Sequence, residues 1–183
     1  MADMNTIQAA IRIMPVGYRF KPTEEELLQH YLMRKHLGIA EASCVIPEVD
    51  LYGWEPEELP TKFSESSVVQ PEDLQWWFFC EKRPGLMRQR STNGGFWKKT
   101  GRTIEVKISR DGSERVIGSK NILMFFRGTF SNNTKTEWVM HEFHLPENAL
   151  QDGLMSDSKS YTLCMIMCIK STPANEFRQY LPQ

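Results

Sequence analysis

The sequence predicts an α+β protein in which helices pack against a twisted antiparallel β-sheet. Two observations support this fold class. One strong helix signal lies near the N-terminus, and the later apolar segments are short or alternating runs separated by glycine, asparagine and aspartate turns. At 183 residues the chain is long enough for one sizeable core and short for two independent domains, so we expect a single domain.

The helix signal begins at Thr23. This residue is a suitable N-cap, Glu26 stands three residues later as its capping-box partner, and acidic residues occupy the first turn, where the helix dipole favours them. Gly38 is a suitable stop. Four apolar residues follow the start at helical spacing: Leu27, Leu28, Tyr31 and Leu32. We expect this helix to cover one face of the sheet.

Residues 39–75 contain several prolines and many acidic residues, and we expect irregular structure there, with a short helix at Pro56–Leu59. Leu51, Trp54 and Leu59 should pack this segment onto the core.

The remaining signals are almost all strand signals. Trp76–Phe79 is an apolar run able to fill a core, and Thr103–Ser109 alternates strictly before an Asp-Gly turn at 111–112. Further strands are expected at Glu114–Gly118, Asn121–Arg127, Lys135–Leu145 and Ser160–Lys170. Residues 131–134 indicate a turn, and residues 145–158 a polar loop.

The stretch Trp76–Arg102 combines cations with glycines at 94, 95 and 101. Its basic residues are Lys82, Arg83, Arg88, Arg90, Lys98, Lys99 and Arg102. Residues 76–140 hold 13 Lys+Arg against 5 Asp+Glu, whereas residues 1–75 hold 6 against 13. Lysine and arginine neutralise phosphates, and glycine in a strand lets a ligand approach closely. The segment therefore suggests a strand that faces a polyanion, while an exposed basic loop fits the same composition.

Several classes of site find little support. The four cysteines, Cys44, Cys80, Cys164 and Cys168, form no Cys-x-x-Cys pair, and the apolar neighbours of the last three predict reduced core residues in an intracellular protein. His141 and His144 lack the spacing of an HExxH zinc site, so no metal or other cofactor is expected. The longest apolar run, Leu163–Ile169, is too short to span a bilayer, and the N-terminus lacks a signal-peptide core, so we expect neither secretion nor membrane insertion.

Catalysis is not expected either, because the sequence contains no nucleophile elbow, no phosphate-cradling glycine loop ahead of a helix and no acidic cluster suited to metal-assisted hydrolysis. His141 and Glu142 beside Trp138 could form a catalytic pair, but an alternating strand favours a buried histidine and an exposed acid.

Five blocks in order resemble the NAC domain of plant transcription factors. They are MPVGYRFKPTEEELLQHYL at 14–32, WWFFCEKR at 76–83, GGFWKKTGR at 94–102, IGSKNILMFFRG at 117–128 and KTEWVMHEFHL at 135–145. The resemblance covers roughly residues 13–170 and implies a NAC domain at 13–171, between a flexible tail at 1–12 and a C-terminal tail at 172–183. It also implies a twisted antiparallel sheet between helices, and a dimeric, nuclear protein that binds double-stranded DNA to regulate transcription.

The resemblance further implies that the WKKTG strand enters the major groove edge-on, a geometry that a β-strand allows. Trp97 would be the buried anchor, Arg90 a phosphate contact, and Lys120 and Lys135 further basic positions. The DNA-proximal strand would contain Lys98, Lys99, Thr100, Gly101 and Arg102, with Lys99 where alanine is usual.

In the dimer region, Arg19 and Glu26 match a reciprocal intersubunit salt bridge, and Pro15 and Gly17 a short strand paired across the two-fold axis. The partner is expected to be a second copy or another NAC protein. Val16 replaces a usual proline, and Met165 stands where the family often has arginine, which removes a charge near the DNA side.

Few residues follow the domain, whereas family members carry a long regulatory region. We therefore expect either a fragment or a protein that acts through partners. The alternative function is a NAC-like dimerisation and protein-interaction module that binds DNA weakly by itself.

Overall fold

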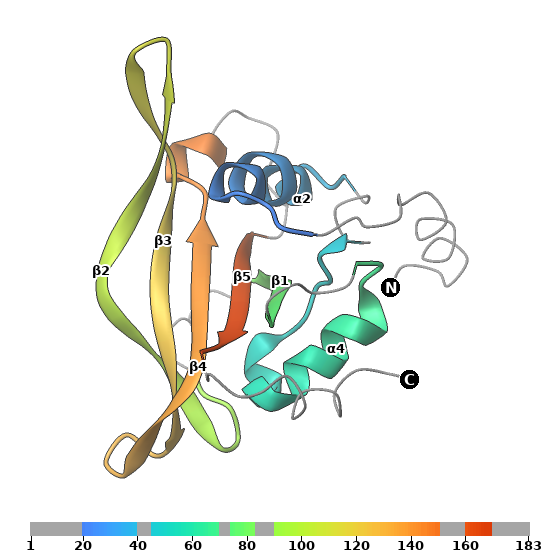
Figure 1. Ribbon diagram of the computed structural model, residues 1–183, viewed down its shortest axis with the longest axis vertical. Helices are drawn as coiled ribbons and strands as arrows, with labels where there is room; N and C mark the ends of the chain where they lie inside the picture. The colour runs from blue at the N-terminus through green and yellow to red at the C-terminus, as the bar shows by residue number, and fades with distance from the viewer. Residues whose placement is uncertain (1–19, 40–44, 70–73, 83–89, 151–159, 170–183) are drawn as a thin grey trace.

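Five antiparallel strands form one sheet in the order β1-β5-β4-β3-β2. The strands are β1 (Gln75–Glu81), β2 (Gly95–Arg110), β3 (Ser113–Gly128), β4 (Asn133–His144) and β5 (Tyr161–Cys168). The computed structural model describes residues 20–39, 45–69, 74–82, 90–150 and 160–169. Figure 1 shows β2 and β3 as long twisted strands on the side of the sheet away from the helices. The α+β fold class is confirmed.

The predicted N-terminal helix is present as the π-helical segment η1 (Glu26–Leu32), which continues into α2 (Met33–His36). The capping box is formed: the backbone N–H of Thr23 donates to Glu26 Oε2 at 2.7 Å, and the N–H of Glu26 donates to Thr23 Oγ1 at 3.2 Å. Gly38 ends the helix with a φ of +71°, a left-handed conformation that glycine adopts without strain.

The helix at Pro56 is longer than predicted. A 3-10 turn, η3 (Pro56–Glu58), leads directly into α4 (Leu59–Ser66). Leu59 and Phe63 are both 0% exposed, and their spacing of four residues places them on one helix face. The first N–H groups of a helix have no partner within the helix, so a proline there loses no hydrogen bond. Pro56 and Pro60 both stand in the first turn of a helical segment and therefore do not interrupt one. The remaining helical pieces are the 3-10 turns η2 (Leu51–Gly53) and η5 (Glu147–Leu150).

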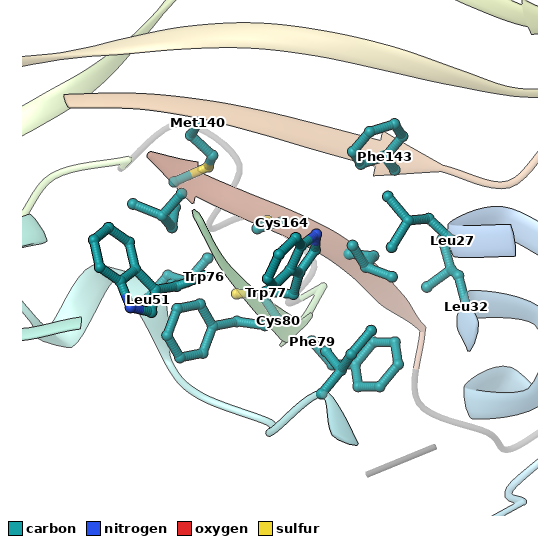
Figure 2. Packing of buried hydrophobic residues seen from close by; sticks show 14 of the residues in the cluster. Leu27, Leu32, Leu51, Trp76, Trp77, Phe79, Cys80, Met140, Phe143 and Cys164 are labelled. Atoms are coloured by element: carbon teal, nitrogen blue, oxygen red, sulfur yellow. The ribbon is translucent and has the colours of Figure 1, made fainter. Parts of the chain in front are cut away.

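The core lies on both faces of β1. Trp77 contacts Phe20, which precedes η1, at a ring distance of 4.9 Å, and the adjacent Phe78 contacts Phe63 of α4 at 5.7 Å. Phe63 also lies 6.3 Å from the Trp77 ring. Because successive strand residues point to opposite faces and Trp76–Cys80 are all buried, both faces of β1 are covered. Figure 2 shows Leu27 and Leu32 directed toward the sheet near Phe143.

Four predicted strands merge into two. Residues 113–128 form one continuous strand, and the WKKTG segment is continuous with the alternating run at 103–109 in β2. The Asp111-Gly112 turn has φ values of 52° and 76°, so both residues adopt the left-handed conformation expected for this hairpin. Cys80 and Cys164 are buried free thiols, as predicted, while Cys168 is only partly buried and Cys44 lies outside the described residues. Across the described part of the chain, no helix has the length and hydropathy to cross a membrane.

Candidate nucleic-acid interface

The basic segment lies on β2, which is an edge strand of the sheet. Only the beginning of this edge is covered. The N–H of Trp97 donates to the Arg90 carbonyl at 2.7 Å, and Ser91 forms a bridge with Phe96. In the regions that the structure describes, no further strand pairs with the outer side of Lys98–Arg110. A long open edge of this kind presents its side chains and backbone to a partner.

Trp97 fixes the start of this edge in the core. Its side chain is 3% exposed and packs against Phe125 with ring centroids 5.2 Å apart. The next two residues, Lys98 and Lys99, are exposed and point to opposite faces of the strand. The buried tryptophan therefore holds two lysines at the sheet edge, one directed to each face.

A bulge follows the two lysines. Thr100 pairs with Ile122 and Ile104 pairs with Lys120, so three residues of β2 face one residue of β3. Gly101 takes a φ of +72°, and no atom lies within 4 Å of the position that a Cβ would occupy. Glycine is therefore required here by backbone conformation and not by crowding. The bulge breaks the alternation of the strand beside Arg102, which is exposed.

Lys99 is the first member of a hydrogen-bonded chain that crosses three strands. Its ammonium donates to Thr103 Oγ1 at 2.5 Å, and the Thr103 hydroxyl donates to Asn121 Oδ1 at 2.9 Å. The Asn121 amide then donates to Glu142 Oε2 at 3.3 Å. Each donor faces the next acceptor, so the chain joins an exposed cation on β2 to a buried carboxylate on β4.

Glu142 is also the partner of Arg90. The Arg90 guanidinium donates to Glu142 Oε2 at 2.7 Å, and His144 Nε2 lies 3.0 Å from the same oxygen. Burial opposes ionisation of Glu142, but the hydrogen bond from His144 and the charges of His144 and Arg90 outweigh it and lower the pKa of this carboxyl. The expectation of an exposed acid at this position was wrong: Glu142 is 4% exposed.

The alternation of side chains along β4 separates His141 from Glu142. These consecutive residues of β4 point to opposite faces, and burial together with the charge of Lys120 lowers the pKa of His141. The two side chains therefore do not form the catalytic pair considered from the sequence. No group of three or more His, Cys, Asp or Glu suited to a metal ion occurs among the described residues.

The other predicted DNA residues differ in their surroundings. Lys120 pairs with Glu24 beside η1, and its side chain is only 15% exposed. Lys135 is exposed on β4, and Thr100 donates its hydroxyl to the Ile122 carbonyl at 3.2 Å. No carboxylate among the described residues pairs with Lys98, Arg102 or Lys135. Three cations therefore face solvent, while Arg90, Lys99 and Lys120 bond to protein groups. The sequence did not predict the hydrogen-bonded chain through Thr103, Asn121 and Glu142. These residues are far apart in the sequence and meet only because β2, β3 and β4 pair in this register.

Two other expectations concern the dimer region and β5. Three residues of the dimer region lie outside the described residues: Pro15, Gly17 and Arg19. Glu26 accepts hydrogen bonds from Thr23, and these lower the pKa of the Glu26 carboxyl. Met165 pairs with both Trp77 and His141, three strand positions from β2. That separation is roughly 14 Å at the usual spacing of ~4.8 Å between strands, so Met165 does not alter the β2 edge directly.

Comparison with known proteins agrees with the five blocks. The family model described as "No apical meristem (NAM) protein" matches residues 15–145. NAC domain-containing protein 45 of Arabidopsis thaliana is 37% identical over 175 residues, which cover 92% of this chain and 35% of that protein. NAC domain-containing protein 54 of Oryza sativa subsp. japonica is 40% identical over 158 residues, covering 84% of this chain and 23% of that protein.

A third relative, NAC domain-containing protein 96 of Arabidopsis thaliana, is 36% identical over 157 residues, covering 84% of this chain and 51% of that protein. The chain thus spans about half or less of the length of these relatives. Its matched region contains the helical segments from η1 to α4 and the strands β1 to β4. By sequence blocks, the match to the no apical meristem (NAM) family model and identity to these relatives, the chain belongs to the NAC family of plant transcription factors.

Proposed function

We propose that the chain is a sequence-specific double-stranded DNA-binding domain that acts as a dimer and inserts the edge of β2 into the major groove. The observation that carries this proposal is the open edge strand itself. Trp97 holds it in the core, while Lys98 and Arg102 face solvent. A strand fits the major groove, and side chains at its edge can reach both base edges and phosphates.

The distribution of charge supports the same role. Lys98 and Arg102 on β2 and Lys135 on β4 are exposed cations on two strands that both pair with β3, whereas Lys120 and Arg90 are partly satisfied by carboxylates. Contact with four to six phosphates per dimer would give a log–log salt slope of about −4 to −5, at ~0.9 per phosphate. The role requires no metal, cofactor or catalytic group, and it places the protein in the nucleus. The boundaries at residues 13 and 171 and the dimer contacts at Pro15, Gly17, Arg19 and Glu26 are parts of this proposal.

The test is selection of bound duplexes from a random pool, followed by a gel-shift titration of the Lys98→Ala/Arg102→Ala variant. Both side chains are exposed, so specific binding should be lost while the melting temperature stays nearly unchanged. Lys62→Ala is the matched control, because Lys62 is a partly exposed lysine on α4, outside the β2 edge. A large loss of stability in the double variant, or an affinity that does not depend on salt, would contradict the proposal.

A second candidate is a dimerisation module that pairs with complete relatives and binds DNA weakly alone. The observation favouring it is that Arg90, Lys99 and Lys120 already bond to protein groups, which reduces the charge available to phosphates. Gel shifts run with and without a full-length NAC partner separate the two candidates. Selective binding by this chain alone supports the first, and binding only with the partner supports the second.

A further inference from the structure

The turn between β3 and β4 presents an aromatic ring to solvent. Phe130 is 75% exposed, more than any other large hydrophobic residue that the structure describes. Its turn is well hydrogen-bonded: the N–H of Thr129 donates to the Asn132 carbonyl at 2.9 Å, and the Asn133 side chain donates to the Phe130 carbonyl at 3.0 Å. The ring is thus held on a closed turn.

Phe130 is the outer member of a stack of three rings. Its centroid lies 4.2 Å from that of Phe96 with 24° between the planes, and Phe96 lies 5.7 Å from Phe126 with 13° between the planes. Phe96 is only 4% exposed, so one face of Phe130 covers it. Covering Phe96 accounts for the inner contact. A single exposed hydrophobic residue is common on protein surfaces. The exposed face of the Phe130 ring therefore indicates a binding surface only if the residues around it fit the same ligand.

Those neighbours are lysines. Cross-strand partners share a face of the sheet, and Phe96, Phe126 and Lys135 form one such row across β2, β3 and β4. Lys98 follows two residues after Phe96 on the same face, with its Nζ 5.8 Å from the Phe126 ring centre. We call these residues the Phe130 patch: Phe96, Lys98, Phe126, Phe130 and Lys135. It combines an exposed ring with two exposed ammonium groups.

A surface with a flat apolar centre and flanking positive charge fits a ligand with apolar parts between anionic groups. Duplex DNA has this chemistry, since deoxyribose and thymine methyl groups lie between phosphates. The patch is also continuous with the β2 edge through Lys98, whose neighbour Trp97 anchors that edge. Charge complementarity and this continuity favour DNA over an acidic protein segment.

We propose that the Phe130 patch is a second contact with the duplex, in which Phe130 packs on the sugars or thymine methyls flanking the bound site while Lys98 and Lys135 neutralise the adjacent phosphates. This inference rests on the proposed function and adds an uncharged contact to it. Apolar packing contributes to affinity without releasing counterions, so its signature is a loss of affinity at constant salt slope.

The experiment is a salt titration of duplex binding for the full chain and its variants. Phe130→Ala should weaken binding about five- to tenfold at every salt concentration with the slope unchanged, because the lost contact is apolar. Lys135→Ala should make the slope shallower by about 0.9, the value for one phosphate. Leu37→Ala is the control, because Leu37 is an exposed hydrophobic residue, 51% accessible, at the end of α2. It should bind like the wild type.

Phe130→Leu tests the ring without uncovering Phe96. It should keep the melting temperature close to that of the wild type and still lose affinity, because leucine offers a smaller flat surface. Wild-type affinity in both Phe130 variants would overturn the inference, and so would a shallower slope in either one. Intact DNA binding together with lost binding of an acidic protein would overturn DNA as the occupant. If the wild type binds no duplex selectively, the proposed function itself fails.

Discussion

Replacing Arg90 by methionine removes the cation from a buried ion pair and leaves Glu142 without its charge partner. The Glu142 side chain is 5% exposed, that of Arg90 is 18% exposed, and their atoms lie 2.7 Å apart. Breaking a buried pair from one side typically costs ~3–5 kcal/mol, because the remaining charge stays desolvated. Asn121 and His144 still bond to the carboxylate, so we expect the lower end of that range, about 3 kcal/mol.

The measurement is thermal and urea unfolding of the wild type, Arg90→Met, Glu142→Gln and the double variant. For a domain of this size, about 3 kcal/mol corresponds to a fall in melting temperature of roughly 6–12 °C. The double variant should recover more than half of the loss, since glutamine removes the buried charge. Lys107→Met is the control, because Lys107 is 47% exposed in its pairs with Glu105 and Glu114, and its removal should cost at most about 0.5 kcal/mol.

The dependence of stability on pH is a second test of the Arg90–Glu142 pair. The folded protein holds the pKa of Glu142 below its ordinary value of 4.5. This carboxylate therefore stabilises the fold above that pH, and the contribution is lost as the pH falls through the folded pKa. Between pH 5 and 3, the wild type should therefore lose more stability than Glu142→Gln. An Arg90→Met variant as stable as the wild type, with a parallel pH profile, would show that Arg90 faces solvent and would refute the reasoning.

Three further predictions concern other parts of the fold. Burial lowers the pKa of His36 from its ordinary value of 6.5, so acidification below that pH should reduce the free energy of unfolding. His36→Gln should flatten this dependence of stability on pH, and an unchanged slope of stability against pH in the variant would contradict the prediction. Gly118→Ala should cost ~1–3 kcal/mol in urea unfolding, since its Cβ would lie 2.6 Å from the His144 carbonyl oxygen and 2.7 Å from Leu28; neutral behaviour would show that both the Leu28 side chain and the His144 backbone move aside. Thr103→Val interrupts the chain from Lys99 and should steepen the salt slope of DNA binding by up to ~0.9 as this lysine becomes available to a phosphate; an unchanged slope would mean that Lys99 is already available.

Local sequence signals determined the elements. The Thr23–Glu26 capping box, the Gly38 stop and the Asp111-Gly112 turn all depend on interactions within a few residues, so their residue types suffice to predict them. The alternation of Ile104, Val106 and Ile108 likewise predicted a strand. The sequence blocks at 14–32 and 94–102 identified the family.

Only the tertiary structure decided which cations face solvent. In the sequence, Lys98, Lys120 and Arg90 are all basic residues of the same segment, and nothing local distinguishes them. In the structure, Lys120 pairs with Glu24, 96 residues away, and Arg90 pairs with Glu142, 52 residues away. Such partners are set by strand register and helix packing, which sequence spacing does not encode. The same register joins Lys99 to Glu142 and places Phe130 over Phe96. Residue types thus determined the strand that carries the charge, and long-range pairing decided how much of that charge a partner can reach.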